Sequence, residues 1–137
     1  MKMLVTAVAL LLVAGCGQTM ASALDTRSTM APPDAFACVM KAFETEGFNR
    51  TSYDKDELRT AARRQNDKIQ ASNTQFRKGW DILEVDIASG AEGQTEMNVK
   101  ASTVGEYFGQ RGPVYEPRET SAEAKEAART IAARCGG

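Results

Sequence analysis

The chain contains no histidine among its 137 residues. This absence removes the usual general base of enzymes, and with it the serine and cysteine triads that depend on an imidazole. It also removes the commonest metal ligand. Any acid–base chemistry would therefore have to use carboxylates alone. A hydrolase with two facing carboxylates stays open as an alternative, whereas a histidine-based enzyme is excluded.

An excess of positive charge is also missing. The whole chain has 17 basic and 18 acidic residues. Residues 1–15 contain one basic residue, Lys2, and no acidic residue, so the rest of the chain has 16 basic and 18 acidic residues. A protein that binds nucleic acid usually carries a basic stripe. The near balance therefore predicts no nucleic-acid partner.

The apolar run near the start of the chain is too short to cross a bilayer as a helix. It follows Lys2 and covers about a dozen residues, whereas a membrane-spanning helix needs roughly 20. A charged start, a short apolar middle and small residues before a cut are typical of a secretory leader. This leader ends in Val13-Ala14-Gly15-Cys16.

These last four residues resemble the lipobox of bacterial lipoproteins. The resemblance implies that residues 1–15 are removed and that Cys16 becomes a diacylated N-terminus, anchored stably because it carries two acyl chains. No aspartate follows Cys16, which by the same resemblance implies the outer membrane, with the domain facing the periplasm. An ordinary cleavage site is the alternative. Ala21-Ser22-Ala23 has the small-x-small form, and a cut there would release a soluble periplasmic protein.

The chain has only three cysteines. With Cys16 acylated, Cys38 and Cys135 remain, one near each end of the folded part. Exported proteins occupy an oxidising compartment, where such a pair usually closes. We therefore expect a Cys38–Cys135 disulfide, which would stabilise the domain by about 2–4 kcal/mol. Two buried free thiols are the alternative.

Composition divides the chain into three parts. Residues 17–31 are rich in Ser, Thr, Ala and Gly, lack periodicity and lead into Pro32-Pro33. Such a segment is typical of a flexible tether. We expect a signal peptide over 1–15, a tether over 16–32 and a single small domain over 33–137.

The domain begins and ends with helical patterns. Apolar residues at helical spacing predict a helix over Asp34–Glu46. A second helix is expected to open at Thr120, with Glu123 completing a capping box. Between the helices, four strands are expected over 48–53, 58–65, 80–88 and 95–103. Residues 66–78 are polar and unpatterned, which predicts a mobile loop.

The last two of these strands alternate strictly between apolar and polar residues. In the first of them, Leu83, Val85 and Ile87 alternate with Glu84 and Asp86, and the next strand repeats the pattern. One face of the sheet is therefore expected to be dry, and the other wet or covered by a partner. Asp81 is placed with Glu84 and Asp86 on the wet face.

The order α-β-β-β-β-α predicts an α+β fold. We expect a two-layer sandwich in which the two helices pack on one face of a small antiparallel sheet.

Residues 104–117 contain five glycines and prolines, so this segment is expected to be irregular. It carries Tyr107, Phe108 and Tyr115. Aromatic side chains on loops often contact partners, which makes these three the candidate partner contacts. The alternative is that they cap the core.

A basic group at Arg63, Arg64 and Lys68 could touch anionic lipid or a partner's acidic patch. A solvated sheet edge is the alternative explanation for these charges.

Gly47-Phe48 follows the first expected helix, and Asp54 follows the first expected strand. With the order of the elements, these residues are similar to the repeated domain of BamC-type lipoproteins. Members of that family carry helix-grip domains on a lipidated tether and belong to the machinery that assembles outer-membrane β-barrels. The resemblance implies a similar topology and a role in that setting. The chain differs from the family in having one domain instead of two and in its pair of cysteines.

These observations together predict a non-enzymatic, lipid-anchored envelope protein. Its domain is expected to bind another envelope protein or a cell-wall component, with no cofactor and no metal. A carboxylate-only periplasmic hydrolase and a domain that carries lipid or another hydrophobic molecule are the alternatives. The second would need an apolar cavity between helices and sheet.

Overall fold

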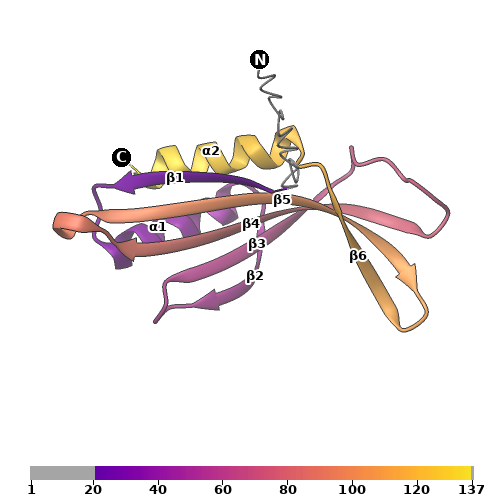
Figure 1. Ribbon diagram of the computed structural model, residues 1–137, viewed down its shortest axis with the longest axis horizontal. Helices are drawn as coiled ribbons and strands as arrows, with labels where there is room; N and C mark the ends of the chain where they lie inside the picture. The colour runs from indigo at the N-terminus through magenta and orange to yellow at the C-terminus, as the bar shows by residue number, and fades with distance from the viewer. Residues whose placement is uncertain (1–20, 137) are drawn as a thin grey trace, which may run out of the picture.

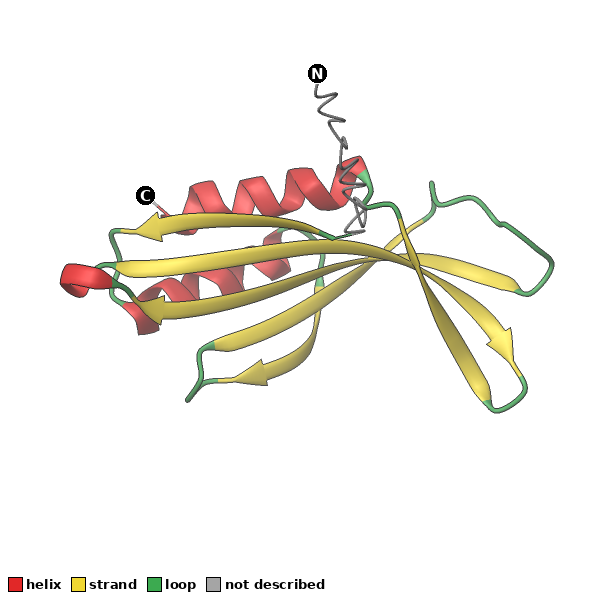
Figure 2. Ribbon diagram, viewed as in Figure 1, coloured by secondary structure: helices red, strands yellow, loops and turns green. Residues whose placement is uncertain are grey.

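Six antiparallel strands and two helices make up the fold in a computed structural model that describes residues 21–136 (Figures 1 and 2). In chain order the elements are β1 (Ser22–Ser28), α1 (Pro32–Thr45), β2 (Asn49–Asp54), β3 (Arg59–Asn66), β4 (Phe76–Ser89), the short 3-10 helix η1 (Ala91–Gly93), β5 (Thr95–Gly109), β6 (Gly112–Arg118) and α2 (Ala122–Gly136). The fold is α+β, and the predicted order of its central elements is correct. The leader and Cys16 lie outside the described residues.

The strands follow the order β1-β5-β4-β3-β2, and β6 also pairs with β5. The long strand β5 has β4 along one side. On its other side it pairs first with β1, over Thr95–Ala101, and then with β6, over Thr103–Gly109. The β5–β6 hairpin extends away from the helices (Figure 1).

Strand β1 corrects the expectation of a flexible tether over 16–32. Residues 22–28 pair with β5 along their whole length, and Ser28 Oγ donates a hydrogen bond of 2.6 Å to the carbonyl of Cys135. The segment has low strand preference of its own, but pairing with a long neighbouring strand outweighs local propensity. The folded part therefore includes Ser22, and the prediction of a tether is wrong for 22–32.

Helix α1 confirms the predicted helix. Pro32 and Pro33 occupy its first turn, where a missing N–H costs nothing. Its end is a Schellman motif: the Phe48 N–H bonds the Phe43 carbonyl, and the Gly47 N–H bonds the Glu44 carbonyl. Gly47 has a φ of +77°, a left-handed conformation that glycine adopts without strain.

The β5–β6 hairpin shows that the expectation of an irregular segment over 104–117 is wrong. Strand β5 continues to Gly109 and turns through Gln110 and Arg111 into β6. Gly112, with a φ of +127°, permits this tight connection. The two prolines of β6 are tolerated because β6 is an edge strand. Strand β4 likewise begins at Phe76, inside the segment that we expected to be a loop.

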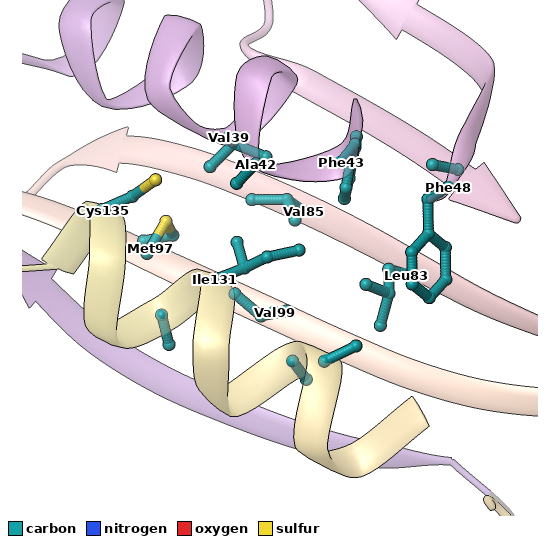
Figure 3. Packing of buried hydrophobic residues seen from close by; sticks show 14 of the residues in the cluster. Val39, Ala42, Phe43, Phe48, Leu83, Val85, Met97, Val99, Ile131 and Cys135 are labelled. Atoms are coloured by element: carbon teal, nitrogen blue, oxygen red, sulfur yellow. The ribbon is translucent and has the colours of Figure 1, made fainter. Parts of the chain in front are cut away.

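The core is built from side chains of both helices and of the sheet (Figure 3). Alternate side chains of β4 and β5 are buried; Val85 and Val99, for example, are at most 1% exposed and belong to one cluster with Val39 and Phe43 of α1 and Ile131 of α2. Burial of each large apolar side chain contributes roughly 1.5–3 kcal/mol. The predicted dry face of the sheet is confirmed.

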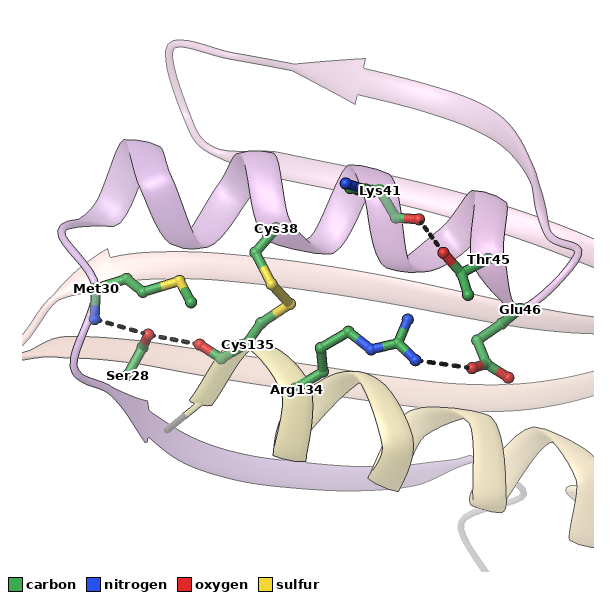
Figure 4. The surroundings of a disulfide bond; sticks show 8 residues. All are labelled: Ser28, Met30, Cys38, Lys41, Thr45, Glu46, Arg134 and Cys135. Carbon is green, nitrogen blue, oxygen red and sulfur yellow. Dashed lines mark hydrogen bonds and ion pairs between the residues drawn. A yellow bond between two sulfur atoms is a disulfide. The ribbon is translucent and has the colours of Figure 1, made fainter.

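A disulfide joins the two helices at the predicted pair, Cys38 in α1 and Cys135 in α2 (Figure 4). The two Cα atoms are 5.7 Å apart, and the cysteines are 97 positions apart in sequence. Beside the bridge, Arg134 reaches Glu46 at 3.8 Å. The alternative of two free thiols is wrong in this structure.

Candidate interaction surface

The sheet face whose side chains point away from the core is called the open face here. It is formed by Arg59 and Arg63 of β3, Lys78, Trp80, Ile82, Glu84 and Asp86 of β4, Asn98, Lys100, Ser102, Val104, Glu106 and Phe108 of β5, and Tyr115 of β6. All of these residues except Glu106 are exposed or half-buried.

One end of the open face is polar and internally paired. Arg59 binds Asp86 at 2.8 Å, and Lys100 binds Glu84 at 3.3 Å. A shallow depression of about 410 Å³ lies at this end, between β1, β4 and β5. The two ion pairs neutralise four of the charges at this end of the face. Exposed pairs of this kind contribute about 1 kcal/mol or less to stability.

The other end of the open face is aromatic, and we call Trp80, Val104, Glu106, Phe108 and Tyr115 the aromatic end. Val104 lies between Trp80 and β6 in the sheet register. Phe108 is 63% exposed and Tyr115 is 47% exposed. The aromatic end thus presents large apolar side chains to solvent.

Cations surround the Trp80 ring. Arg63 Cζ lies 4.0 Å from its centroid, and Lys78 Nζ lies 5.2 Å from it. A second guanidinium, that of Arg77, lies 4.8 Å from the ring centroid of Phe108. An irregularity between Phe76 and Lys78 in the β4–β5 register brings these consecutive cations, Arg77 and Lys78, toward the same face.

Glu106 is the buried polar centre of the aromatic end, only 5% exposed. Its Oε1 accepts hydrogen bonds from Trp80 Nε1 at 3.2 Å and from the Tyr115 hydroxyl at 3.1 Å. Its Oε2 accepts no hydrogen bond and lies 3.4 Å from Arg77 Nη1. The carboxylate thus orients two of the aromatic rings.

The structure separates the three aromatic residues singled out from the sequence. Phe108 and Tyr115 belong to the exposed aromatic end, as expected of partner contacts. Tyr107 is only 4% exposed; its hydroxyl shares a hydrogen bond of 2.7 Å with Ser72, and its ring contacts Phe76 edge-on. It is therefore buried on the opposite side of β5, and its prediction as a partner contact is wrong. Alternation along β5 explains this outcome, since Phe108 is its neighbour.

The three basic residues singled out from the sequence do not form one patch. Arg63 lies on the open face, whereas Arg64 Nη1 donates a hydrogen bond of 2.8 Å to the Glu46 carbonyl at the end of α1. Lys68 binds Glu123 at 2.7 Å. Of the three, only Arg63 is left for a partner on the open face.

The Lys68–Glu123 pair perturbs both groups. The hydrogen bond from Lys68 lowers the pKa of Glu123 to about 2, with backbone hydrogen bonding adding to the effect. The same hydrogen bond raises the pKa of Lys68. Glu123 lies in the first turn of α2, where a negative charge is favourable.

The helix cap predicted at Thr120 is displaced by one residue. Ser121 Oγ accepts a hydrogen bond from the Ala124 N–H at 3.0 Å, so Ser121 caps α2 and the capping box of Thr120 with Glu123 is wrong. Ser121 Oγ also donates to Asp81 at 2.7 Å. The cap is thereby tied to the sheet.

Asp81 is fully buried, contrary to its predicted place on the wet face. It has the same alternation as Leu83, so it points toward the helices. Its carboxylate accepts hydrogen bonds from Asn66, Thr103 and Ser121, at 2.7–2.9 Å. These three hydrogen bonds explain why the carboxylate of Asp81 is tolerated in the interior.

Within residues 21–136, no group of three or more histidine, cysteine, aspartate or glutamate residues could hold a metal ion. No helix within the same range is long and apolar enough to cross a membrane.

No model of a known protein family matches the chain, and a search of curated proteins finds no significant relative.

Proposed function

We propose that this protein is a non-enzymatic lipoprotein of a bacterial envelope, anchored through Cys16 to the outer membrane, whose domain holds another envelope protein on its open face. The observation that carries the partner role is the solvent-exposed aromatic end. Exposed aromatic residues beside arginine are typical of the centre of protein interfaces. Resemblance to BamC-type lipoproteins suggests the assembly of outer-membrane β-barrels as the setting.

The position of β1 favours cleavage before Cys16 over cleavage after Ala23. Ser22 and Ala23 pair with Ala101 and Lys100 of β5. A cut after Ala23 would remove both residues from the strand, whereas a cut before Cys16 leaves the whole strand intact. Only residues 17–21 then separate the lipid from β1, and five residues span at most about 18 Å. The domain would thus lie close to the membrane.

The proposed architecture is a two-layer sandwich with both helices forming one layer. It is supported by the apolar side chains of β4 and β5 that pack with both helices, and by the polar side chains on the alternate positions. In this arrangement nothing within residues 21–136 covers the open face, which leaves it to a partner.

Site-directed photo-crosslinking in cells tests the partner role. A photo-reactive phenylalanine analogue in place of Phe108 should give a discrete crosslinked protein. The same analogue in place of Tyr53 is the matched control, since Tyr53 is 51% exposed but lies on β2 at the far edge of the sheet. Crosslinks that are absent at Phe108, or equally strong at Tyr53, would contradict a partner on the open face.

Mass spectrometry of the mature protein tests the anchor separately. We expect an N-terminal peptide that begins at Cys16 and carries acyl chains, and a Cys16→Ala variant that is neither acylated nor cut at that position. A mature chain that begins at Leu24 without lipid would overturn the lipoprotein assignment.

A further inference from the structure

We infer that the aromatic end binds an extended acidic segment of the partner protein, with carboxylates of that segment reaching Arg63 and Lys78. This inference rests on the proposed function and specifies the chemistry of the partner. It starts from a difference between the cations of the open face.

Two cations of the open face, and the neighbouring Arg77, have carboxylate partners within the domain. Arg59 binds Asp86, Lys100 binds Glu84, and Arg77 binds Glu106. Arg63 and Lys78 form no ion pair with any residue in 21–136, although both lie over the half-buried ring of Trp80. The domain thus leaves two positive charges uncompensated beside its exposed aromatic residues.

Charge complementarity therefore selects an acidic ligand. The chain as a whole has a net charge of −1, so this local excess does not follow from composition. A cation over an aromatic ring keeps a fixed position, and a carboxylate that approaches it finds its target already ordered. Apolar side chains of the same segment would lie on Val104, Phe108 and Tyr115.

The occupied ring argues against a glycan as the ligand. Sugars and nucleic-acid bases bind tryptophan by stacking on its ring face. The Arg63 guanidinium already lies over the Trp80 ring at 4.0 Å. The available chemistry is that of the two cations and the neighbouring apolar side chains, which suits a peptide better.

A membrane surface is also a poorer match. Anionic bilayers are recognised by clusters of about four to eight basic residues, whereas the described residues place two unpaired cations, Arg63 and Lys78, over the Trp80 ring. The β6 edge is equally unsuited to pairing with a partner strand, because Pro113 and Pro117 remove backbone donors. The segment would therefore lie across the face of the sheet and not along its edge.

Trp80 is the only tryptophan of the chain, so its fluorescence reports binding at this place. The probe is a soluble peptide of about ten residues that alternates glutamate with leucine, titrated into the whole exported protein in mild detergent. We expect saturable binding with a change in Trp80 emission. The matched peptide of alternating lysine and leucine should not bind.

Paired variants assign the effect to the two free cations. Arg63→Gln with Lys78→Gln should weaken binding about tenfold or more, the loss of two charge-assisted contacts. The control is Arg59→Gln with Lys100→Gln, which removes two paired cations from the same face and should change affinity less than about twofold. Circular dichroism verifies that both double variants remain folded.

Several outcomes would overturn the inference. These are failure of the acidic peptide to bind, equal binding of the lysine peptide, equal losses in the two double variants, or tighter binding to phosphatidylglycerol vesicles than to the peptide. Self-association that competes with the peptide would identify a second copy as the occupant and would also overturn it. If the Phe108 crosslink persists in any of these cases, the partner role survives and only the acidic chemistry fails.

Discussion

At the scale of single residues, buried polar groups decide how α2 joins the sheet. Asp81 of β4 accepts hydrogen bonds from residues on β3, β5 and the cap of α2. Removal of the carboxylate leaves three donors without their acceptor, and each buried unsatisfied group costs roughly 1–3 kcal/mol. We expect Asp81→Ala to lower the free energy of unfolding by about 3 kcal/mol or more, measured by urea denaturation.

A matched control for Asp81 exists on the same strand. Glu84→Ala removes an exposed carboxylate of the open face and should change stability by less than about 1 kcal/mol. Similar losses in the two variants would show that Asp81 does not anchor the helix.

The Lys68–Glu123 pair makes stability depend on pH. Because folding lowers the pKa of Glu123 from 4.5 to about 2, its stabilisation is complete above about pH 4.5 and disappears as the pH falls toward 2. Unfolding measurements in low salt should show that the native protein loses more stability than Glu123→Gln over this interval. An NMR titration of the Glu123 carboxyl gives the pKa directly.

Lys68→Met tests the cause of that shift. Without the hydrogen bond from Lys68, the pKa of Glu123 should rise toward 4.5, and high salt should weaken the difference since the pair is exposed. A Glu123 pKa that stays near 2 in this variant would assign the shift to the backbone contacts instead.

At the scale of elements, local pattern predicted those elements that carry their own periodicity. The predictions of helix α1 and of the alternating parts of β4 and β5 were correct because one face of each element is continuously apolar. Strands β1 and β6 were missed because Ser, Asp, Gly and Pro have low strand preference. Both exist through pairing with β5. For β1 this is a long-range contact that no local window contains, whereas β6 pairs with β5 in a hairpin whose strand residues are weak strand formers.

The candidate site shows the same division. Phe108 and Tyr115 were singled out by their type and their position among glycines, and the structure exposes both side chains; their role as partner contacts stays a prediction. The cluster around Trp80 was missed because it depends on register. Arg63 reaches Trp80 only through the pairing of β3 with β4, and Lys78 through the irregularity that follows Phe76.

A close approach between an element and a loop gives an element-scale prediction. A Cβ added at Gly79 of β4 would overlap Ile69, which lies in the loop between β3 and β4. Overpacking of this kind costs about 1–3 kcal/mol. We expect Gly79→Ala to destabilise the domain and to increase amide exchange in residues 67–75.

Gly93→Ala is the comparison for Gly79. Gly93 also adopts a conformation that disfavours alanine, with a φ of +72°, but an added Cβ there meets no atom within 4 Å. Gly93→Ala should therefore lower the free energy of unfolding without faster amide exchange in the loop between β3 and β4. Faster exchange in both variants would contradict the local contact with Ile69.

At the scale of the whole molecule, one covalent bond closes almost the entire domain. The disulfide joins α1 to α2 across 97 residues, and the same Cys135 contributes its carbonyl to Ser28 of β1. Three elements from the two ends of the chain thus meet at one place beside the core (Figure 4). A bridge over so long a loop lowers the entropy of the unfolded chain. In the chain-entropy description this stabilises the folded domain by about 4.7 kcal/mol.

Loss of the bridge should therefore weaken the domain as a unit. Cys38→Ala with Cys135→Ala is expected to lower the free energy of unfolding by about 2–5 kcal/mol, measured in urea with tryptophan fluorescence. Reductant should produce a similar loss in the native protein and none in the double variant. Trp80 lies on the open face and far from the bridge in sequence, so its fluorescence reports unfolding of the sheet. If reductant lowers the urea midpoint of this fluorescence transition, the bridge stabilises the sheet as well as the helices. A native protein whose unfolding midpoint ignores reductant would instead mean that the core alone holds the two helices on the sheet.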